Sequence, residues 1–333
     1  MSKFLEMLEK HPVLLADGAT GTNLFDKGLE SGMAPEIWNL ELADNIRELH
    51  QSFVDAGSDI LVTNSFGGSA RRLHLHNLHT RVHEINARAA EIAAEIVAKS
   101  GRSMVVAGSV GPTGDLFAPL GELTYAQGVE VFIEQIAGLE AGGADVAWIE
   151  TMSAPEEIDA AIEAANEVGL PYTVTVSFDT AGRSMMGLAP GAFATSMTCK
   201  SPAPAAIGSN CGVGASDLLF ALLDVVKNAG DLPVIAKANA GVPQVRGDAV
   251  HYSGTPDLME DYARLAIDVG ARIIGGCCGN TPEHVARMRK AIDNHKKGAS
   301  PSRAELEEAL GALVAPPATG EKEQSGRRRR RTS

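Results

Sequence analysis

Eight short apolar runs alternate along this chain with longer segments of helical periodicity, and this alternation restricts the fold more than any other feature. The runs begin at Val13, Asp59, Met104, Asp145, Tyr172, Ala205, Pro233 and Arg272. Segments between them, such as NIRELHQSFVDAG and LMEDYARLAIDVG, have an apolar helix face and end in the glycine typical of a helix C-terminus. Strands that alternate with helices form parallel βαβ units, and eight units predict an α/β fold of the (β/α)8 TIM-barrel type. A doubly wound open sheet is the alternative.

The length of the chain fits one barrel followed by a short extension. The chain has 333 residues, and α/β barrels reach about 250 residues as one domain. We therefore assign residues 1–298 to the barrel and residues 299–333 to the extension. The extension holds one short helical pattern and then Pro, Gly, Ser and charged residues, including five consecutive arginines. We expect it to lie outside the core and to be largely disordered. The arginines are typical of a solvated charge run, and binding to an acidic partner or RNA is the alternative.

Charge and cysteine content narrow the class of protein. The formal net charge is −13, which argues against a nucleic-acid-binding surface. Four cysteines are too few for a disulfide framework in a chain of this length. The N-terminal segment MSKFLEMLEKHP has no apolar signal region, and no apolar run is long enough for a membrane span. We expect a cytoplasmic location, where paired cysteines more often bind a metal or act in catalysis than form a disulfide.

Three of the four cysteines fall where the apolar runs end. Cys211 follows the sixth run, and Cys277 and Cys278 follow the eighth. In a barrel the active site lies at the C-terminal ends of the strands, and these two strands have one strand between them. Adjacent side chains of a strand point to opposite faces, but the glycines of GGCCG allow a turn that lets both sulfurs converge. Three thiolates predict Zn²⁺, with the fourth position open as in a catalytic site.

Other interpretations of the cysteines account for less. A disulfide between Cys277 and Cys278 would leave Cys211 without a role. An iron–sulfur cluster needs four cysteines as a rule, and the remaining one, Cys199, is expected to be a small buried apolar residue.

Further polar residues follow other runs but are less specific. Asp17 closes the first run and Glu150 the fourth, so either carboxylate could bind an ammonium group or serve only as a capping or loop residue. The segment DGATGTNL combines glycines with backbone N–H groups at the start of a helical pattern, which can hold a carboxylate or a phosphate.

Several motifs together carry a resemblance to a known family. DGATGTNL, TNSFGGS, GSVGPTGDL, IETMSAPEE, GSNCGVG, ANAGVP and GGCCGNTPEHV resemble segments of the homocysteine S-methyltransferase family, from about Val13 to about Ile292. The resemblance implies a zinc-containing (β/α)8 barrel that transfers a methyl group to homocysteine and forms methionine.

The resemblance also implies roles for individual residues. The three cysteines at the strand ends would be the zinc ligands. Asp17 and Glu150 would hold the ammonium group of homocysteine, and the backbone around Gly18 and Ala19 would meet its carboxylate. Asn239, in ANAGVP, would orient the site or complete the zinc coordination when the substrate is absent.

The methyl donor is the least determined part of this interpretation. The segment from Ala34 to Ser69 resembles the homocysteine module of cobalamin-dependent methionine synthase, which carries further modules for folate, cobalamin and reactivation. We therefore expect a separate methylcorrinoid protein as donor. Betaine is an alternative, because Trp38 and Phe66 could face a quaternary ammonium group; a methylsulfonium compound is another. Two further hypotheses are a non-catalytic zinc-binding subunit of a corrinoid methyl-transfer complex and, ranked last, a phosphate-binding barrel.

Overall fold

The computed structural model describes residues 2–246 and 249–317 and contains a parallel sheet of eight strands. The strands of this sheet are β1 (Leu14–Leu15), β2 (Ile60–Val62), β3 (Val105–Val110), β4 (Val146–Met152), β5 (Tyr172–Val176), β6 (Ala206–Cys211), β7 (Val234–Ala238) and β10 (Ile273–Gly276). Each overlaps one of the eight apolar runs. Their spatial order is β1-β10-β7-β6-β5-β4-β3-β2, so β7 separates the two strands that carry the cysteines.

The sheet closes on itself between β1 and β2. The Asp59 N–H donates to the Leu15 carbonyl oxygen at 2.7 Å, and the Asp17 N–H donates to the Ile60 carbonyl oxygen at 3.1 Å. These bonds join the first and last strands of the sheet order, which an open sheet would leave apart. The predicted (β/α)8 barrel is therefore confirmed, and the doubly wound alternative is wrong.

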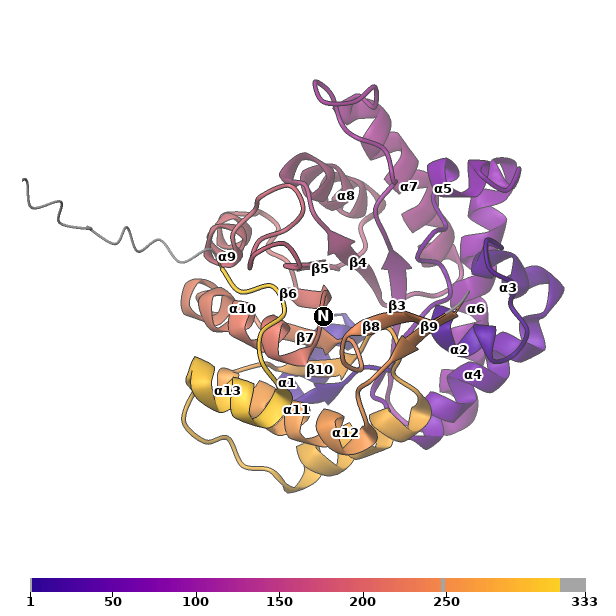
Figure 1. Cartoon of the computed structure of the whole chain (residues 1–333). Helices are drawn as coiled ribbons and strands as arrows, with labels where there is room; N and C mark the ends of the chain where they lie inside the picture. The colour runs from indigo at the N-terminus through magenta and orange to yellow at the C-terminus, as the bar shows by residue number, and fades with distance from the viewer. Residues whose placement is uncertain (1, 247–248, 318–333) are drawn as a thin grey trace, which may run out of the picture.

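Helices surround the barrel (Figure 1). They are α1 (Lys3–Lys10), α2 (Gly21–Phe25), α3 (Trp38–Glu41), α4 (Ala43–Asp55), α5 (Ala70–His74), α6 (Val82–Ser100), α7 (Tyr125–Ala141), α8 (Pro155–Val168), α9 (Pro190–Thr198), α10 (Ala215–Asn228), α11 (Pro256–Val269), α12 (Pro282–Asn294) and α13 (Arg303–Leu310), with 3₁₀ turns at Pro35–Ile37 and His79–Arg81. The predicted glycine stops occur after α4 and α11, where Gly57 and Gly270 take φ values of +97° and +119°. None of the described helices is both long and apolar enough to cross a membrane.

The core has two shells. Inside the barrel, branched aliphatic residues pack around Trp148, which is fully buried, and the α1 residues Phe4, Met7 and Leu8 close the N-terminal end. A larger shell lies between the strands and the outer helices. Because α1 fills one end of the barrel, a site within the barrel opens at the other end.

A small hairpin lies in the connection after β7. Its strands β8 (Pro243–Arg246) and β9 (Ala249–Tyr252) pair antiparallel, apart from the main sheet. The ring of Tyr252 packs against Gly279, where a Cβ atom would lie 2.3 Å from Tyr252 Cγ. The end of the hairpin therefore lies against the loop that carries Cys278.

The short helix expected after residue 298 is α13, but it does not lie outside the core. Leu306 is fully buried in the outer shell of the core. Beyond the helix, the Val314 and Ala315 N–H groups donate to the carboxylate of Asp217 on α10, at 2.9 and 2.8 Å. The first part of the extension therefore packs on the barrel. The rest of the extension, from residue 318 on and with the arginine run, lies outside the described residues, so its expected disorder and the boundary at 298 stay predictions.

Candidate functional site

The structure brings the three cysteines of the strand ends together. Cys211 is the last residue of β6, and Cys277 and Cys278 follow β10. Their Sγ atoms all lie within 4.8 Å of one another. Cys211 takes a φ of +63°, which is uncommon for a residue other than glycine, and Gly212 and Gly279 take φ values of +76° and +78°. These turns give the convergence that the glycines around the cysteines predict.

The thiols resist ionisation when no cation is near. For Cys211, a hydrogen bond with Cys277 lowers the pKa, but the bond with Cys278 and burial outweigh it, so the pKa rises to about 12. For Cys278, the bond with Cys211 lowers the pKa, but the bond with Cys277 and its charge raise it to about 12. The bond with Cys211 raises the pKa of Cys277. Three adjacent thiolates therefore need a bound cation, and a coordinating metal deprotonates such thiols.

Two amide side chains orient the cysteines. Asn239 Nδ2 donates to Cys211 Sγ at 3.7 Å and to the Gly212 carbonyl oxygen at 2.6 Å. Asn239 Oδ1 is buried and has no hydrogen-bond partner among the described residues. Asn210 Nδ2 donates to Cys277 Sγ at 3.9 Å and to Thr151 Oγ1 at 2.7 Å. Three converging soft thiols fit a Zn²⁺ site.

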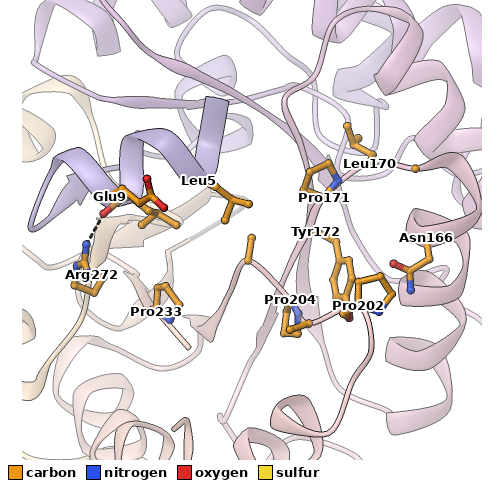
Figure 2. Close-up of a pocket in the computed structure, with 14 residues that line it drawn as sticks. Leu5, Glu9, Asn166, Leu170, Pro171, Tyr172, Pro202, Pro204, Pro233 and Arg272 are labelled. Atoms are coloured by element: carbon orange, nitrogen blue, oxygen red, sulfur yellow. Dashed lines mark hydrogen bonds between the residues drawn. The ribbon is translucent and has the colours of Figure 1, made fainter. Parts of the chain in front are cut away.

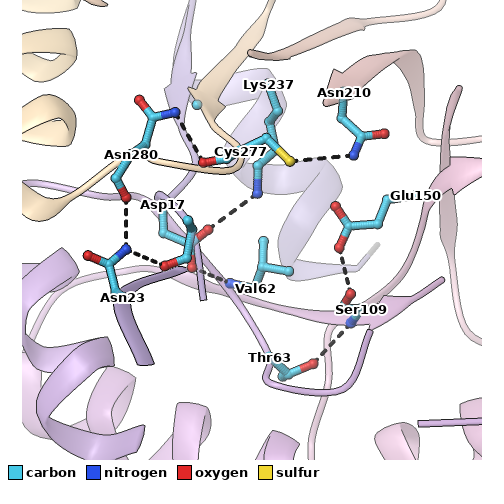
Figure 3. A network of polar contacts seen from close by, with 12 residues as sticks. Asp17, Asn23, Val62, Thr63, Ser109, Glu150, Asn210, Lys237, Cys277 and Asn280 are labelled. Atoms are coloured by element: carbon cyan, nitrogen blue, oxygen red, sulfur yellow. Dashed lines mark hydrogen bonds and ion pairs between the residues drawn. The ribbon is translucent and has the colours of Figure 1, made fainter. Parts of the chain in front are cut away.

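Asp17 lies at the same end of the barrel interior and is 1% exposed. Its Oδ2 accepts a hydrogen bond from the Val62 N–H at 2.8 Å, and its Oδ1 lies 3.4 Å from Lys237 Nζ. Burial raises the pKa of Asp17 to about 6, and the charge of Lys237 offsets part of that rise. The Asp17 carboxylate is thus already paired within the protein (Figure 3).

Glu150 lies across the barrel mouth from Asp17 (Figure 3) and is 7% exposed. Its Oε1 accepts a hydrogen bond from Ser109 Oγ at 2.5 Å. The Ser109 N–H in turn donates to Thr63 Oγ1 at 3.0 Å. This chain of bonds through β3 fixes one carboxylate oxygen of Glu150.

A sequence model described as homocysteine S-methyltransferase matches residues 14–292, which include the three cysteines and both carboxylates. The chain belongs to the homocysteine S-methyltransferase family. The match confirms the family resemblance of the motifs.

Two mycobacterial relatives of this homocysteine S-methyltransferase family member are methionine synthases. That of Mycobacterium tuberculosis (strain ATCC 25618 / H37Rv) is 30% identical over 304 residues, which are 86% of this chain and 25% of that protein. That of Mycobacterium leprae (strain TN) is 29% identical over 308 residues, 87% of this chain and 25% of that protein. The chain thus spans about a quarter of the length of these curated relatives.

A solved structure supports the fold of this family member. The homocysteine methyltransferase MmuM from Escherichia coli, in a metallated form, superposes with a TM-score of 0.70 at 24% identity, over 86% of this chain and 99% of that one. The same protein in an oxidized form matches equally well, with a TM-score of 0.70.

Gly18 and Ala19 lie beside the cysteine loop, as their expected role requires, but one of their amides is engaged. The Ala19 N–H donates to the Asn280 carbonyl oxygen at 3.0 Å. Gly18 packs so closely that a Cβ atom would lie 2.6 Å from that oxygen and 2.8 Å from the Phe53 ring. A substrate carboxylate would have to replace the bond from Ala19.

Sequence reasoning missed Lys237 and Tyr252. Lys237 interrupts the apolar run PVIAKAN two residues before Asn239, so strand alternation alone would have placed it on the same face as that asparagine. Tyr252 donates a hydrogen bond to the Cys278 sulfur, and burial raises the pKa of its hydroxyl. Nothing in the sequence around Tyr252 indicates this contact.

The expectation for Cys199 is wrong. It caps α9 at the helix C-terminus and is exposed, because the chain there leaves the helix on the outer surface. A pocket of about 850 Å³ lies far from the cysteines, at the N-terminal end of the barrel, between α1 and the segments before β5 and β6 (Figure 2). TIM-barrel active sites lie at the opposite end, so we do not place the reaction in this pocket.

Proposed function

We propose that this protein is a zinc-dependent homocysteine S-methyltransferase that forms methionine. The observation that carries the proposal is the convergence of Cys211, Cys277 and Cys278, with Sγ atoms within 4.8 Å, at the barrel end that also holds Asp17 and Glu150. A soft metal site and two carboxylates in one mouth suit a substrate with a thiol and an ammonium group. The reducing cytoplasm, the location we infer, would keep these thiols free.

Zinc is the metal that the donor set suits. Bound by the three cysteines, it would ionise the thiol of homocysteine and keep the sulfur electron-rich, since the thiolates outnumber the charges of the ion. Asn239 and Asn210 would hold Cys211 and Cys277 in place through their bonds to the sulfurs. The Asn239 oxygen is free to act as a further ligand before the substrate binds.

The remaining residues would orient the acceptor. Glu150 would bind the ammonium group through the oxygen that Ser109 does not hold, beside Asp17, which Lys237 already pairs. The backbone at Gly18 and Ala19 would bind the carboxylate. In the transfer, the sulfur forms a bond to the methyl carbon, the donor's bond to that carbon breaks, and the thiol proton is released to solvent.

We propose a separate methylcorrinoid protein as the methyl donor, because neither Trp38 nor the positions of Gly67 and Gly68 offer a small cation an aromatic face. Trp38, the expected cage residue for betaine, is buried in the core. Gly67 and Gly68 leave no space for an aromatic ring, because a Cβ at Gly68 would lie 2.3 Å from Asn86 Oδ1 and one at Gly67 would lie 2.9 Å from Glu36 Oε1.

The surface beside the site is suited to a protein partner. A groove of about 430 Å³ runs from Thr151 and Ser177, next to Glu150, to the loop after β3. Exposed apolar side chains border it, among them Leu116, Leu120 and Met185. Apolar patches next to a site often mark binding surfaces.

The test is zinc content measured together with methyl transfer to homocysteine from methylcobalamin, betaine and S-methylmethionine. We expect near one zinc per chain and methionine formation, both lost in Cys277→Ala and both kept in Cys199→Ala, which removes an exposed cysteine. Turnover with betaine alone would overturn the corrinoid donor. Zinc binding without turnover from any donor would favour the non-catalytic subunit, and the absence of zinc would refute the proposed function.

A further inference from the structure

Lys237 places a positive charge inside the barrel, where the proposed substrate would bring its own. Lys237 lies on β7, between the two strands that carry the cysteines, and is 3% exposed. Its Nζ atom lies 3.4 Å from Asp17 Oδ1 and 5.7 Å from the centroid of the Trp148 ring. The charged and titratable groups that act on it are Asp17, Glu150 and Cys277.

The negative charges around Lys237 outnumber its single positive charge. Two carboxylates, Asp17 and Glu150, share one internal ammonium group (Figure 3). Of these two carboxylates, Asp17 contacts Lys237 directly, whereas Glu150 is held by the neutral Ser109 hydroxyl. One carboxylate is therefore neutralised by the protein, and the other is left for a ligand.

Stability alone does not account for this pair. Taking two charges out of water costs about as much as their attraction returns, and well-packed apolar residues of similar volume are often as stable. A lysine among the aliphatic residues of the barrel interior therefore points to the ligand rather than to the fold.

We propose that Lys237 is a specificity-determining residue: it takes the place of the substrate ammonium at Asp17, so that Glu150 alone holds an α-ammonium group. A short thiol carboxylic acid that lacks the α-amine then loses one charged hydrogen bond relative to the amino thiol, rather than two. This inference rests on the proposed function, because it concerns the acceptor bound at the same site.

Binding, rather than turnover, gives the sharpest test. Isothermal titration calorimetry on the zinc-loaded protein would compare L-homocysteine with 4-sulfanylbutanoate, which is the same thiol without its amine. The measured quantity is the ratio of their dissociation constants at about pH 8, where Asp17, with a pKa of about 6, is ionised. We expect a ratio of about tenfold to hundredfold in the wild-type protein, since one charged hydrogen bond discriminates.

Two variants test whether the ratio depends on the release of the Asp17 carboxylate from Lys237. In Lys237→Met the Asp17 carboxylate is released for the substrate, and we expect the ratio in favour of homocysteine to rise about tenfold to hundredfold, the effect of one further charged hydrogen bond. In the double variant Asp17→Asn/Lys237→Met no carboxylate is released, and the ratio is expected to stay near the wild-type value. The double variant also removes both buried charges, so it tests the idea if Lys237→Met does not fold.

An unchanged ratio in Lys237→Met, with zinc content and melting temperature preserved, would overturn the inference. So would a rise in the double variant equal to that in the single one, or a wild-type ratio far above hundredfold. Failure of the proposed function is distinguishable, because then neither thiol would bind the zinc-loaded protein in any variant.

Discussion

His50 gives the clearest link between burial and stability in this protein. It lies on α4, is 1% exposed, and neither ring nitrogen has a hydrogen-bond partner among the described residues. Burial lowers the pKa of His50 from 6.5 to about 4. The imidazole of the folded protein therefore stays neutral between about pH 6.5 and pH 4, the range in which the same ring in the unfolded chain binds a proton.

The sign and size of the effect follow from these two pKa values. Above about pH 6.5 both states hold a neutral ring, and the full stability is present. As the pH falls from 6.5 towards 4, the unfolded chain binds a proton that the folded chain excludes, so the free energy of unfolding decreases by about 1.4 kcal/mol per pH unit. The total loss is about 3 kcal/mol when the folded pKa is reached.

The perturbation is His50→Leu, which keeps an apolar side chain of similar size and removes the titration. Urea unfolding at about pH 8, 6.5, 5.5 and 4.5 gives the difference in the free energy of unfolding between variant and wild type, in which all other titrations cancel. We expect this difference to shift in favour of the variant by about 2–3 kcal/mol from pH 8 to 4.5. His83→Leu, at an exposed position of α6, is the control and should show no such shift. A flat difference for His50→Leu would refute the idea of a buried, unpartnered neutral ring.

Three further predictions concern the site and the loop that supports it. Glu150→Gln should raise the KM for homocysteine about tenfold to hundredfold in steady-state assays, because it removes a charged hydrogen bond. The control Glu156→Gln, at an exposed position, should leave this KM unchanged. Equal KM values for Glu150→Gln and the wild-type protein would exclude Glu150 as an ammonium ligand. Gly68→Ala should destabilise the protein by about 1–3 kcal/mol in urea unfolding, because the added Cβ would lie 2.3 Å from Asn86 Oδ1, while Gly21→Ala, with open space around it, should not. Treatment with a zinc chelator should abolish methyl transfer, and added Zn²⁺ should restore it; activity that survives after metal analysis shows no zinc would contradict the proposed function.

The fold was predictable because its pattern is local and repeated. Each strand of the barrel is a short apolar run, and alternation with helices fixes the parallel order. The same regularity placed Cys211 and Cys277 at strand ends two positions apart in the sheet, which no single segment of sequence reveals. Their convergence needed only the glycines that follow them.

The features that the sequence did not reveal depend on contacts between distant segments. Lys237 is one polar residue in an apolar run, and its role follows from Asp17, which lies 220 positions away in the chain. The packing of α13 depends on Leu306 and on Asp217, which accepts hydrogen bonds from the chain beyond the helix. The sequence around Cys199 does not distinguish a buried cysteine from an exposed one. Its exposure follows from its place at the C-terminal end of α9.

The geometry of the barrel explains why a polar site of this kind is stable. Every second residue of a strand points inward, so at the C-terminal end the inward positions of separate strands meet: Ser109 from β3, Glu150 from β4 and Lys237 from β7. Asp17 and Glu150 are each satisfied by a partner on another strand, and each bond fixes one oxygen. Because α1 closes the opposite end with apolar side chains, a ligand can approach this polar layer only from the mouth where the three thiols lie. A substrate must therefore meet the cysteines and the carboxylates together, and the spacing between them sets which thiols fit.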